Sequence, residues 1–286
     1  MWCFPVPLIR CLRGRPTVKI VRWAAALPAA LVALAVLQPV SHAESAKPPK
    51  KVTTVVSLTF DDGDVTHAAT ARMLEKRGMR GTFYVNTDTI GRDAKLTRRE
   101  LAAIAKAGHE IGGHTLTHIR LTELTQGEQR AQICDDRRAL VAWGYRPTTL
   151  AYPFGSVDAD AKAVARRCGY DAARRVGGLK DWGCRGCQAG EDLRPRDRYE
   201  IRTPGSIRDD TLPRQMRQQV LNAEKSGGGL VPLVFHRVCD GCGLYSVSPK
   251  TLDEFLGWLA TRKSRGTVVK TLHDAVGARY RPVPAE

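Results

Sequence analysis

The chain has 286 residues, of which 45 are basic and 29 acidic, and its formal net charge at pH 7 is +16. This length is enough for one large α/β domain with a full hydrophobic core. The charge balance suits anionic partners such as cell-wall polymers, although a coding bias toward arginine would give the same number. We do not expect nucleic acid as a partner, because no predicted helix concentrates basic residues with interleaved aromatics.

The first 43 residues have the layout of an export signal. Five basic residues and no acidic residue precede an apolar run over 23–37, and a small-residue cleavage site follows at Ser41-His42-Ala43. The run is shorter than the roughly 20 residues that span a bilayer, so cleavage is favoured over retention as an anchor. We therefore expect a signal peptide over 1–43, a flexible tether over 44–51 and a folded domain over 52–286. The mature protein would be secreted or associated with the cell wall, with no stable membrane span.

Export determines how the cysteines are interpreted. The mature chain would keep an even number of cysteines, and disulfides are the default in an oxidising compartment. These residues are Cys134, Cys168, Cys184, Cys187, Cys239 and Cys242. We predict Cys134–Cys168 as the first bridge, because each lies on a predicted helix beside the predicted fourth strand. The sequence does not determine how the cysteines of the two C-x-x-C pairs are connected. An alternative for these four thiolates is a zinc ribbon that binds nucleic acid.

Short apolar segments alternate with helix-like segments along the rest of the chain. Strands are expected at 52–60, 81–85, 109–112, 149–152, 170–173, 231–235 and 267–272. Helices are expected at 67–77, 97–107, 122–143, 158–168, 209–226 and 249–263. Such alternation indicates parallel strands joined by crossovers, and at this length it favours a barrel or a doubly wound sheet. Polar residues follow the strands, and in a β/α barrel that C-terminal rim is where sites are built.

The first polar motif is T-F-D-D-G at residues 59–63. Asp61 and Asp62 are adjacent carboxylates at the mouth of a strand and point to opposite sides. One can therefore bind a cation while the other faces water or substrate. The same residues also fit an ordinary turn, so this motif needs support from others.

The second motif joins His114 and His118, and the third is the single residue His236. Two histidines four residues apart project to one side of a helical turn and can reach one ion. The alternative is a pair of surface or helix-capping histidines, but Gly112 and Gly113 just before them indicate crowded backbone. His236 ends an apolar run and would be structural by itself. Beside a metal site it could donate a proton, because histidine titrates in the useful range.

These three elements, with Ala151-Tyr152-Pro153-Phe154-Gly155 between the second and third, resemble the polysaccharide deacetylase family. This family comprises the family-four carbohydrate esterases, which share the nodulation-factor deacetylase domain. The resemblance covers about residues 52–276. It implies an α/β fold, a distorted (β/α) barrel of about seven strands with its site at the C-terminal rim.

The resemblance implies a role for each matching residue. Asp61 would be the catalytic base, while Asp62, His114 and His118 would hold a divalent metal, most often Zn²⁺. His236 would be the general acid for the leaving amine. A backbone N–H such as that of Tyr152 would help to stabilise the oxyanion, a contact worth roughly 3 to 4 kcal/mol.

The reaction implied is removal of N-acetyl groups from N-acetylglucosamine-containing polysaccharide, such as peptidoglycan, chitin or poly-N-acetylglucosamine. One alternative is O-deacetylation of acetylxylan or another acetylated wall polymer. Another, from a different class, is a noncatalytic carbohydrate-binding protein on the same fold. Assays of acetate release and of metal dependence distinguish these hypotheses.

The chain departs from the family pattern at two places. Ala151 stands where the family commonly has an arginine that orients the base, and the A-Y-P-F-G form is similar to a subset that includes enzymes acting on poly-N-acetylglucosamine. We expect Arg202, in the strand-like segment 199–203, to replace the missing arginine. Asp181-Trp182 resembles the end of the family's fourth motif but also fits a simple loop.

Overall fold

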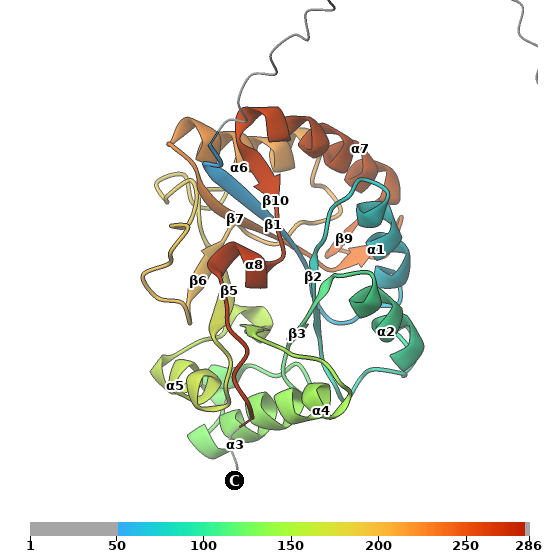
Figure 1. Ribbon diagram of the computed structural model, residues 1–286, viewed down its shortest axis with the longest axis vertical. Helices are drawn as coiled ribbons and strands as arrows, with labels where there is room; N and C mark the ends of the chain where they lie inside the picture. The colour runs from blue at the N-terminus through green and yellow to red at the C-terminus, as the bar shows by residue number, and fades with distance from the viewer. Residues whose placement is uncertain (1–50, 284–286) are drawn as a thin grey trace, which may run out of the picture. The chain divides into compact units, whose positions relative to one another are not determined.

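The computed structural model describes residues 51–283, which are built around a curled sheet of parallel strands (Figure 1). The sheet follows the order β7-β1-β2-β3-β4-β5-β6, and the short β10 pairs with the first half of β1. The strands are β1 (Thr54–Phe60), β2 (Thr82–Val85), β3 (Glu110–Gly113), β4 (Thr149–Ala151), β5 (Ala172–Gly178), β6 (Ile201–Thr203), β7 (Gly229–Phe235) and β10 (Thr267–Val269). This half-barrel confirms the predicted α/β fold. The predicted signal peptide and the tether up to residue 50 lie outside the described residues.

Helices lie between most successive parallel strands, as the alternating pattern predicts, whereas β5 and β6 are joined by a loop and α8 follows β10. The helices are α1 (His67–Glu75), α2 (Arg98–Lys106), α3 (Gln126–Arg130), α4 (Asp136–Ala142), α5 (Ala159–Arg167), α6 (Pro213–Lys225), α7 (Pro249–Ala260) and α8 (Leu272–Val276). In Figure 1, α3, α4 and α5 gather at one end of the view, and α6 and α7 lie at the other. Within residues 51–283, no helix combines the length and apolar character that crossing a bilayer requires.

The helix expected over 122–143 is present from Gln126 to Ala142, but it begins later than predicted and is not a regular α-helix throughout. A 3₁₀ turn at Leu121–Glu123 precedes α3, and Thr125 then begins α3 with a capping box that it shares with Glu128. A π-helical turn at Ala131–Asp135 joins α3 to α4. This turn contains Cys134, which is buried and bonded to Cys168 at the end of α5.

Two glycines in β3 allow it to pass close to its neighbours. A Cβ atom on Gly112 would lie 2.4 Å from the Tyr84 ring, and one on Gly113 would lie 1.9 Å from the Tyr170 hydroxyl. Neither distance is sterically possible. The crowding inferred from the sequence at these glycines is therefore present, and it lets β3 deliver the following residue, His114, to the rim.

Three disulfides connect the six cysteines of the described residues. The Cα atoms lie 5.1 Å apart in Cys134–Cys168, 5.4 Å apart in Cys184–Cys187 and 5.9 Å apart in Cys239–Cys242. All three distances fall in the range of real bridges. The predicted Cys134–Cys168 bridge is confirmed. The zinc-ribbon alternative is contradicted, because each C-x-x-C pair is closed on itself.

Candidate metal and acid–base site

The two aspartates begin the site where β1 ends. The Asp61 backbone N–H donates to the Phe235 carbonyl oxygen at 2.9 Å, which continues the pairing of β1 with β7. Asp62 then adopts a φ of 76°, in the left-handed region that aspartate tolerates better than most residues. Asp61 is 2% exposed, whereas the Asp62 side chain is 29% exposed. Neighbouring carboxylates of the same motif thus occupy different environments.

The structure brings Asp62, His114 and His118 together. Asp62 Oδ1 lies 3.4 Å from His114 Nε2 and 3.3 Å from His118 Nε2. One ligand atom from each residue falls within 4.8 Å of the others. Two ligands about 2.0 to 2.1 Å from a tetrahedral ion would be separated by roughly 3.3 to 3.4 Å. These residues therefore have the spacing of a divalent-metal site.

The orientation of His114 also fits a metal ligand. Its Nδ1 is 2.7 Å from the Ala151 carbonyl oxygen, which can only accept, so Nδ1 carries the proton. Nε2 is then left with its lone pair directed toward Asp62. Asp62 Oδ1 is itself buried and has no hydrogen-bond partner among the described residues. The hydrogen bond from His114 Nδ1 to the Ala151 carbonyl oxygen is typical of histidines that bind a metal through the other ring nitrogen.

The segment from His114 to His118 is a loop and not the helical turn that we expected. Thr115 has a φ of 69° and His118 a φ of 59°, so both are left-handed. The Thr115 hydroxyl accepts a hydrogen bond from the His118 backbone N–H at 3.2 Å. The two imidazoles therefore converge through this tight loop, with ring centroids 4.9 Å apart.

The charges of the three residues also suit a cation. Burial would raise the pKa of Asp62, but the nearby imidazoles, His114 first, lower it well below its usual range. Burial lowers the pKa of His118, and the nearby His114 lowers it further, to about 4. Burial opposes protonation of His114, yet the charges of Asp61 and Asp62 raise its pKa overall. An ionised carboxylate next to imidazoles is a donor set that divalent zinc accepts, in competition with protons.

Arg174 orients Asp61, and Arg202 does not. The Arg174 guanidinium on β5 donates to Asp61 Oδ1, and both side chains are buried. Arg202, our expected partner, donates instead to Glu191, from Nε at 2.8 Å and from Nη2 at 2.7 Å. That prediction is wrong. The register of β4 and β5 would have indicated Arg174. This residue pairs directly with Ala151, the position where the family commonly has its arginine.

The environment of Asp61 keeps it ionised. Burial by itself would raise the pKa of this carboxyl. The charges of Arg174, His114 and His236 outweigh burial, and the pKa of Asp61 is lowered overall. Asp61 Oδ2 lies 3.9 Å from His114 Nε2, so the carboxylate faces the metal-binding residues. It can therefore act as a base there.

His236 lies beside Asp61 because β7 and β1 are paired in parallel. Phe235 is in register with Phe60, so the next residue of each strand is His236 and Asp61. Burial lowers the pKa of His236, and the charges of Asp61 and Asp62 only partly oppose this. Tyr245 lies against its ring, with centroids 5.2 Å apart. The predicted acid and base are thus on adjacent strand ends.

Two residues singled out from the sequence have other roles. The Tyr152 backbone N–H donates to the Arg174 carbonyl oxygen at 3.0 Å, so it extends the β4–β5 pairing and is not free to stabilise an oxyanion. That prediction is contradicted. Asp181 accepts hydrogen bonds from the backbone N–H groups of Gly183, Cys184 and Gly205 at 2.6 to 2.8 Å. These contacts are those of a loop-stabilising residue.

Two aromatic side chains at the rim were not predicted as site residues. Phe154 is 53% exposed, and its ring lies 4.5 Å from that of His118. Tyr245 is 41% exposed and contacts His236. Exposed rings beside a polar site are suited to pack on the apolar faces of sugars. Phe154 belongs to the Ala151–Gly155 motif, but the motif does not show that its ring lies beside His118, and no local pattern marks Tyr245.

Comparison with known proteins identifies relatives of the chain. Residues 48–173 match the family model described as polysaccharide deacetylase. The chain is 30% identical over 138 residues to the peptidoglycan-N-acetylglucosamine deacetylase PgdA of Listeria monocytogenes, covering 47% of this chain and 28% of that relative. It is 27% identical over 178 residues to chitin deacetylase 2 of Saccharomyces cerevisiae, covering 62% of this chain and 48% of that relative. The chain spans less than half the length of these curated relatives.

Solved structures share the fold. A family 4 acetyl xylan esterase from Clostridium thermocellum, in complex with a cobalt ion, has a TM-score of 0.54 at 21% identity, covering 78% of this chain and 91% of that one. A family 4 carbohydrate esterase from Streptomyces lividans has a TM-score of 0.51 at 18% identity, covering 81% and 99%. The resemblance deduced from the sequence motifs is confirmed.

Proposed function

We propose that this chain, whose residues 48–173 match the polysaccharide deacetylase model, is a metal-dependent hydrolase that removes N-acetyl groups from N-acetylglucosamine-containing polysaccharide. One observation carries the proposal: Asp62, His114 and His118 converge beside the buried Asp61–Arg174 pair. Relatives whose names specify peptidoglycan and chitin support this substrate class. Peptidoglycan, chitin-like polymers and poly-N-acetylglucosamine are the candidate substrates.

The acid–base chemistry follows from the environments of the two groups. Asp61 is ionised and fixed by Arg174, so it can accept a proton from the attacking water. A divalent ion, most readily Zn²⁺, held by Asp62, His114 and His118 would supply Lewis-acid polarisation of the acetamide carbonyl. His236 delivers a proton to the nitrogen as the C–N bond breaks. One water is consumed, and acetate and a glucosamine unit are released.

The sugar would be held by the rim. Phe154 offers an exposed ring beside His118, and Tyr245 offers one beside His236. The protein would act outside the cytoplasm, at the cell wall, after removal of a signal peptide over 1–43 and with its catalytic domain over 52–286. Its basic charge would favour anionic wall polymers.

The test is acetate release from peptidoglycan, chitin oligomers, poly-N-acetylglucosamine and acetylxylan, each with and without a chelator. We expect release from at least one N-acetylated polymer, loss of release with the chelator, and recovery with Zn²⁺. Asp61→Asn, which keeps the shape of the side chain, is the inactive control. Release from acetylxylan alone would identify an O-deacetylase. Binding without release would identify a carbohydrate-binding protein.

A further inference from the structure

The imidazole of His236 lacks the hydrogen bond that fixes the other reacting groups. Asp61 is held by Arg174, and His114 is held by the Ala151 carbonyl. His236 Nδ1 is buried and has no hydrogen-bond partner within residues 51–283. A general acid must nevertheless be held in place to reach its leaving group. Its position has to come from contacts to the backbone and from packing.

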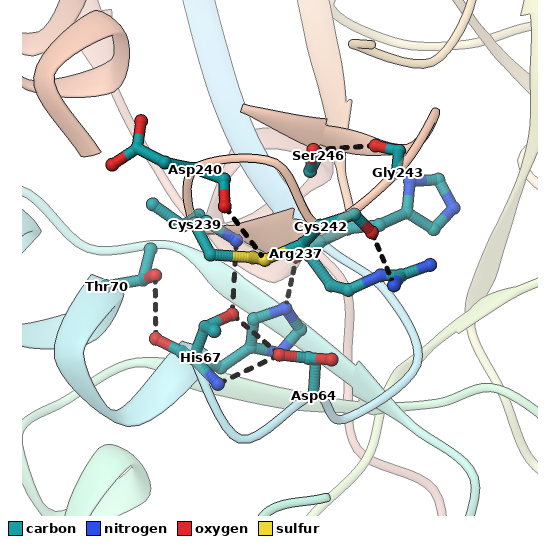
Figure 2. Close-up of a disulfide and its surroundings, with 12 residues drawn as sticks. Asp64, His67, Thr70, Arg237, Cys239, Asp240, Cys242, Gly243 and Ser246 are labelled. Atoms are coloured by element: carbon teal, nitrogen blue, oxygen red, sulfur yellow. Dashed lines mark hydrogen bonds between the residues drawn. A yellow bond between two sulfur atoms is a disulfide. The ribbon is translucent and has the colours of Figure 1, made fainter. Parts of the chain in front are cut away.

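We propose that His67 and the loop closed by the Cys239–Cys242 disulfide position His236 for proton donation. The proposal rests on the function proposed above. Figure 2 shows the His67 imidazole directed toward this loop, and Asp64 beside it. His67 and the disulfide are positioning elements, because they act through His236 and not on the sugar.

The first anchor is a hydrogen bond to the His236 backbone. His67 Nε2 lies 2.6 Å from the His236 carbonyl oxygen. A carbonyl only accepts, so Nε2 must carry the proton and the tautomer is fixed. His67 is fully buried, and its ring lies 5.8 Å from that of Phe60 and 5.6 Å from that of Phe83. A ring packed in this way holds its donor, and therefore the carbonyl, in one place.

The second anchor lies two residues further along the chain. The Val238 backbone N–H donates to the Thr66 hydroxyl at 3.1 Å, and that hydroxyl donates to Asp64 Oδ1 at 2.7 Å. In extended chain, the C=O of one residue and the N–H two residues later lie on the same edge. Adjacent residues Thr66 and His67 therefore hold that edge of the chain on both sides of Arg237.

The loop closed by the Cys239–Cys242 disulfide leads to Tyr245, which contacts the ring of His236. Cys239 follows Val238 directly, and its bridge to Cys242 closes a tight loop. Arg237 contacts the far side of this loop: its backbone N–H donates to the Tyr245 carbonyl at 3.2 Å and its Nη1 to the Cys242 carbonyl at 2.6 Å. Tyr245 at the end of the loop packs on the imidazole. The bridge thus stabilises the turn that carries the packing partner of His236.

The Cys184–Cys187 bridge is a matched control. It has the same spacing, and its Cα atoms lie 5.4 Å apart, compared with 5.9 Å in Cys239–Cys242. It lies in the loop between β5 and β6, where Asp181 accepts a hydrogen bond from the Cys184 backbone N–H. Removal of the Cys184–Cys187 bridge should loosen its own loop about as much as removal of Cys239–Cys242 loosens the other loop, but it should not displace His236.

The experiment compares two substrates. An N-acetylglucosamine oligomer has an amine leaving group that needs a proton, whereas 4-nitrophenyl acetate has a leaving group that departs without one. We would measure kcat, KM and zinc content for His67→Phe, for Cys239→Ser/Cys242→Ser and for the Cys184→Ser/Cys187→Ser control. His67→Gln serves as a rescue variant, since its amide can still donate to the carbonyl.

We expect His67→Phe and Cys239→Ser/Cys242→Ser to lower kcat on the oligomer about 10- to 100-fold, part of what a general acid contributes. KM, zinc content and turnover of the aryl acetate should stay within about threefold of the wild type. His67→Gln and the Cys184→Ser/Cys187→Ser control should retain oligomer turnover. Equal losses on both substrates, or no loss on the oligomer, would overturn the positioning role. A wild-type protein that releases no acetate from any sugar polymer would instead refute the proposed function, and the positioning role with it.

Discussion

The first part of the sheet, from β1 to β4, and the second, from β5 to β7, build the site in different ways. The first part supplies Asp61, Asp62, His114 and His118 from two short motifs, within the residues that match the family model. The second part supplies Arg174 and His236 as single residues, one from β5 and one following β7. The metal-binding residues of the first part can therefore be recognised from short sequence motifs. Strand register brings the arginine that orients the base, and the acid itself, to the site.

The two parts also differ in how they hold their side chains. His114 is oriented by a direct hydrogen bond to the neighbouring strand β4, and Asp61 by one to Arg174 on β5. His236 depends on its backbone and on a cross-linked loop. We therefore expect substitutions in the first part to abolish the site. Substitutions in the second part should leave a metal site that turns over slowly.

The largest effect is expected from removing a metal ligand of the first part. His118→Ala should lower bound zinc from about one ion per chain to near zero and reduce acetate release at least about 10³-fold, because the Lewis acid is lost. Metal analysis after dialysis, together with acetate release, measures both. His273→Ala is the control, since His273 lies on α8 and hydrogen-bonds to Thr148. Full zinc retention in His118→Ala would contradict the ligand assignment.

A smaller loss is expected when the second part is changed at Arg174. Arg174→Lys keeps a positive charge but cannot reproduce the planar guanidinium, so kcat should fall about 10- to 100-fold while zinc remains bound. Arg174→Met removes the charge that lowers the pKa of Asp61. That pKa should then rise, so the acid limb of kcat/KM moves upward by about 1 to 3 pH units. An unchanged acid limb would show that Arg174 does not tune the base.

Features of the fold and site that follow from local sequence patterns can be predicted, whereas those that depend on strand register or loop conformation cannot. The parallel α/β fold, the Cys134–Cys168 bridge and the two motifs at the rim follow from periodicity and spacing. The left-handed residues Thr115 and His118 do not, because no pattern distinguishes this loop from one turn of helix. The pairing of the Tyr152 N–H with Arg174 also escapes prediction, since it requires the register of β4 and β5.

The smallest effect is expected from a substitution of Arg202. It tests whether the arginine on β5 or the one on β6 serves Asp61. Arg174 and Arg202 both lie on strands of the second part, β5 and β6, and either could be expected to reach Asp61 from the sequence. The Arg202 guanidinium is instead paired with Glu191, and its side chain is 35% exposed.

Arg202→Lys should therefore leave kcat, KM and zinc content within about twofold of the wild type. It should lower the free energy of unfolding by about 1 kcal/mol, because one ammonium replaces two hydrogen bonds in a partly screened pair. Parallel assays of Arg202→Lys and Arg174→Lys, with urea unfolding of each, make the comparison. If Arg202→Lys lost turnover as strongly as Arg174→Lys, β6 and not β5 would carry the arginine that serves the base.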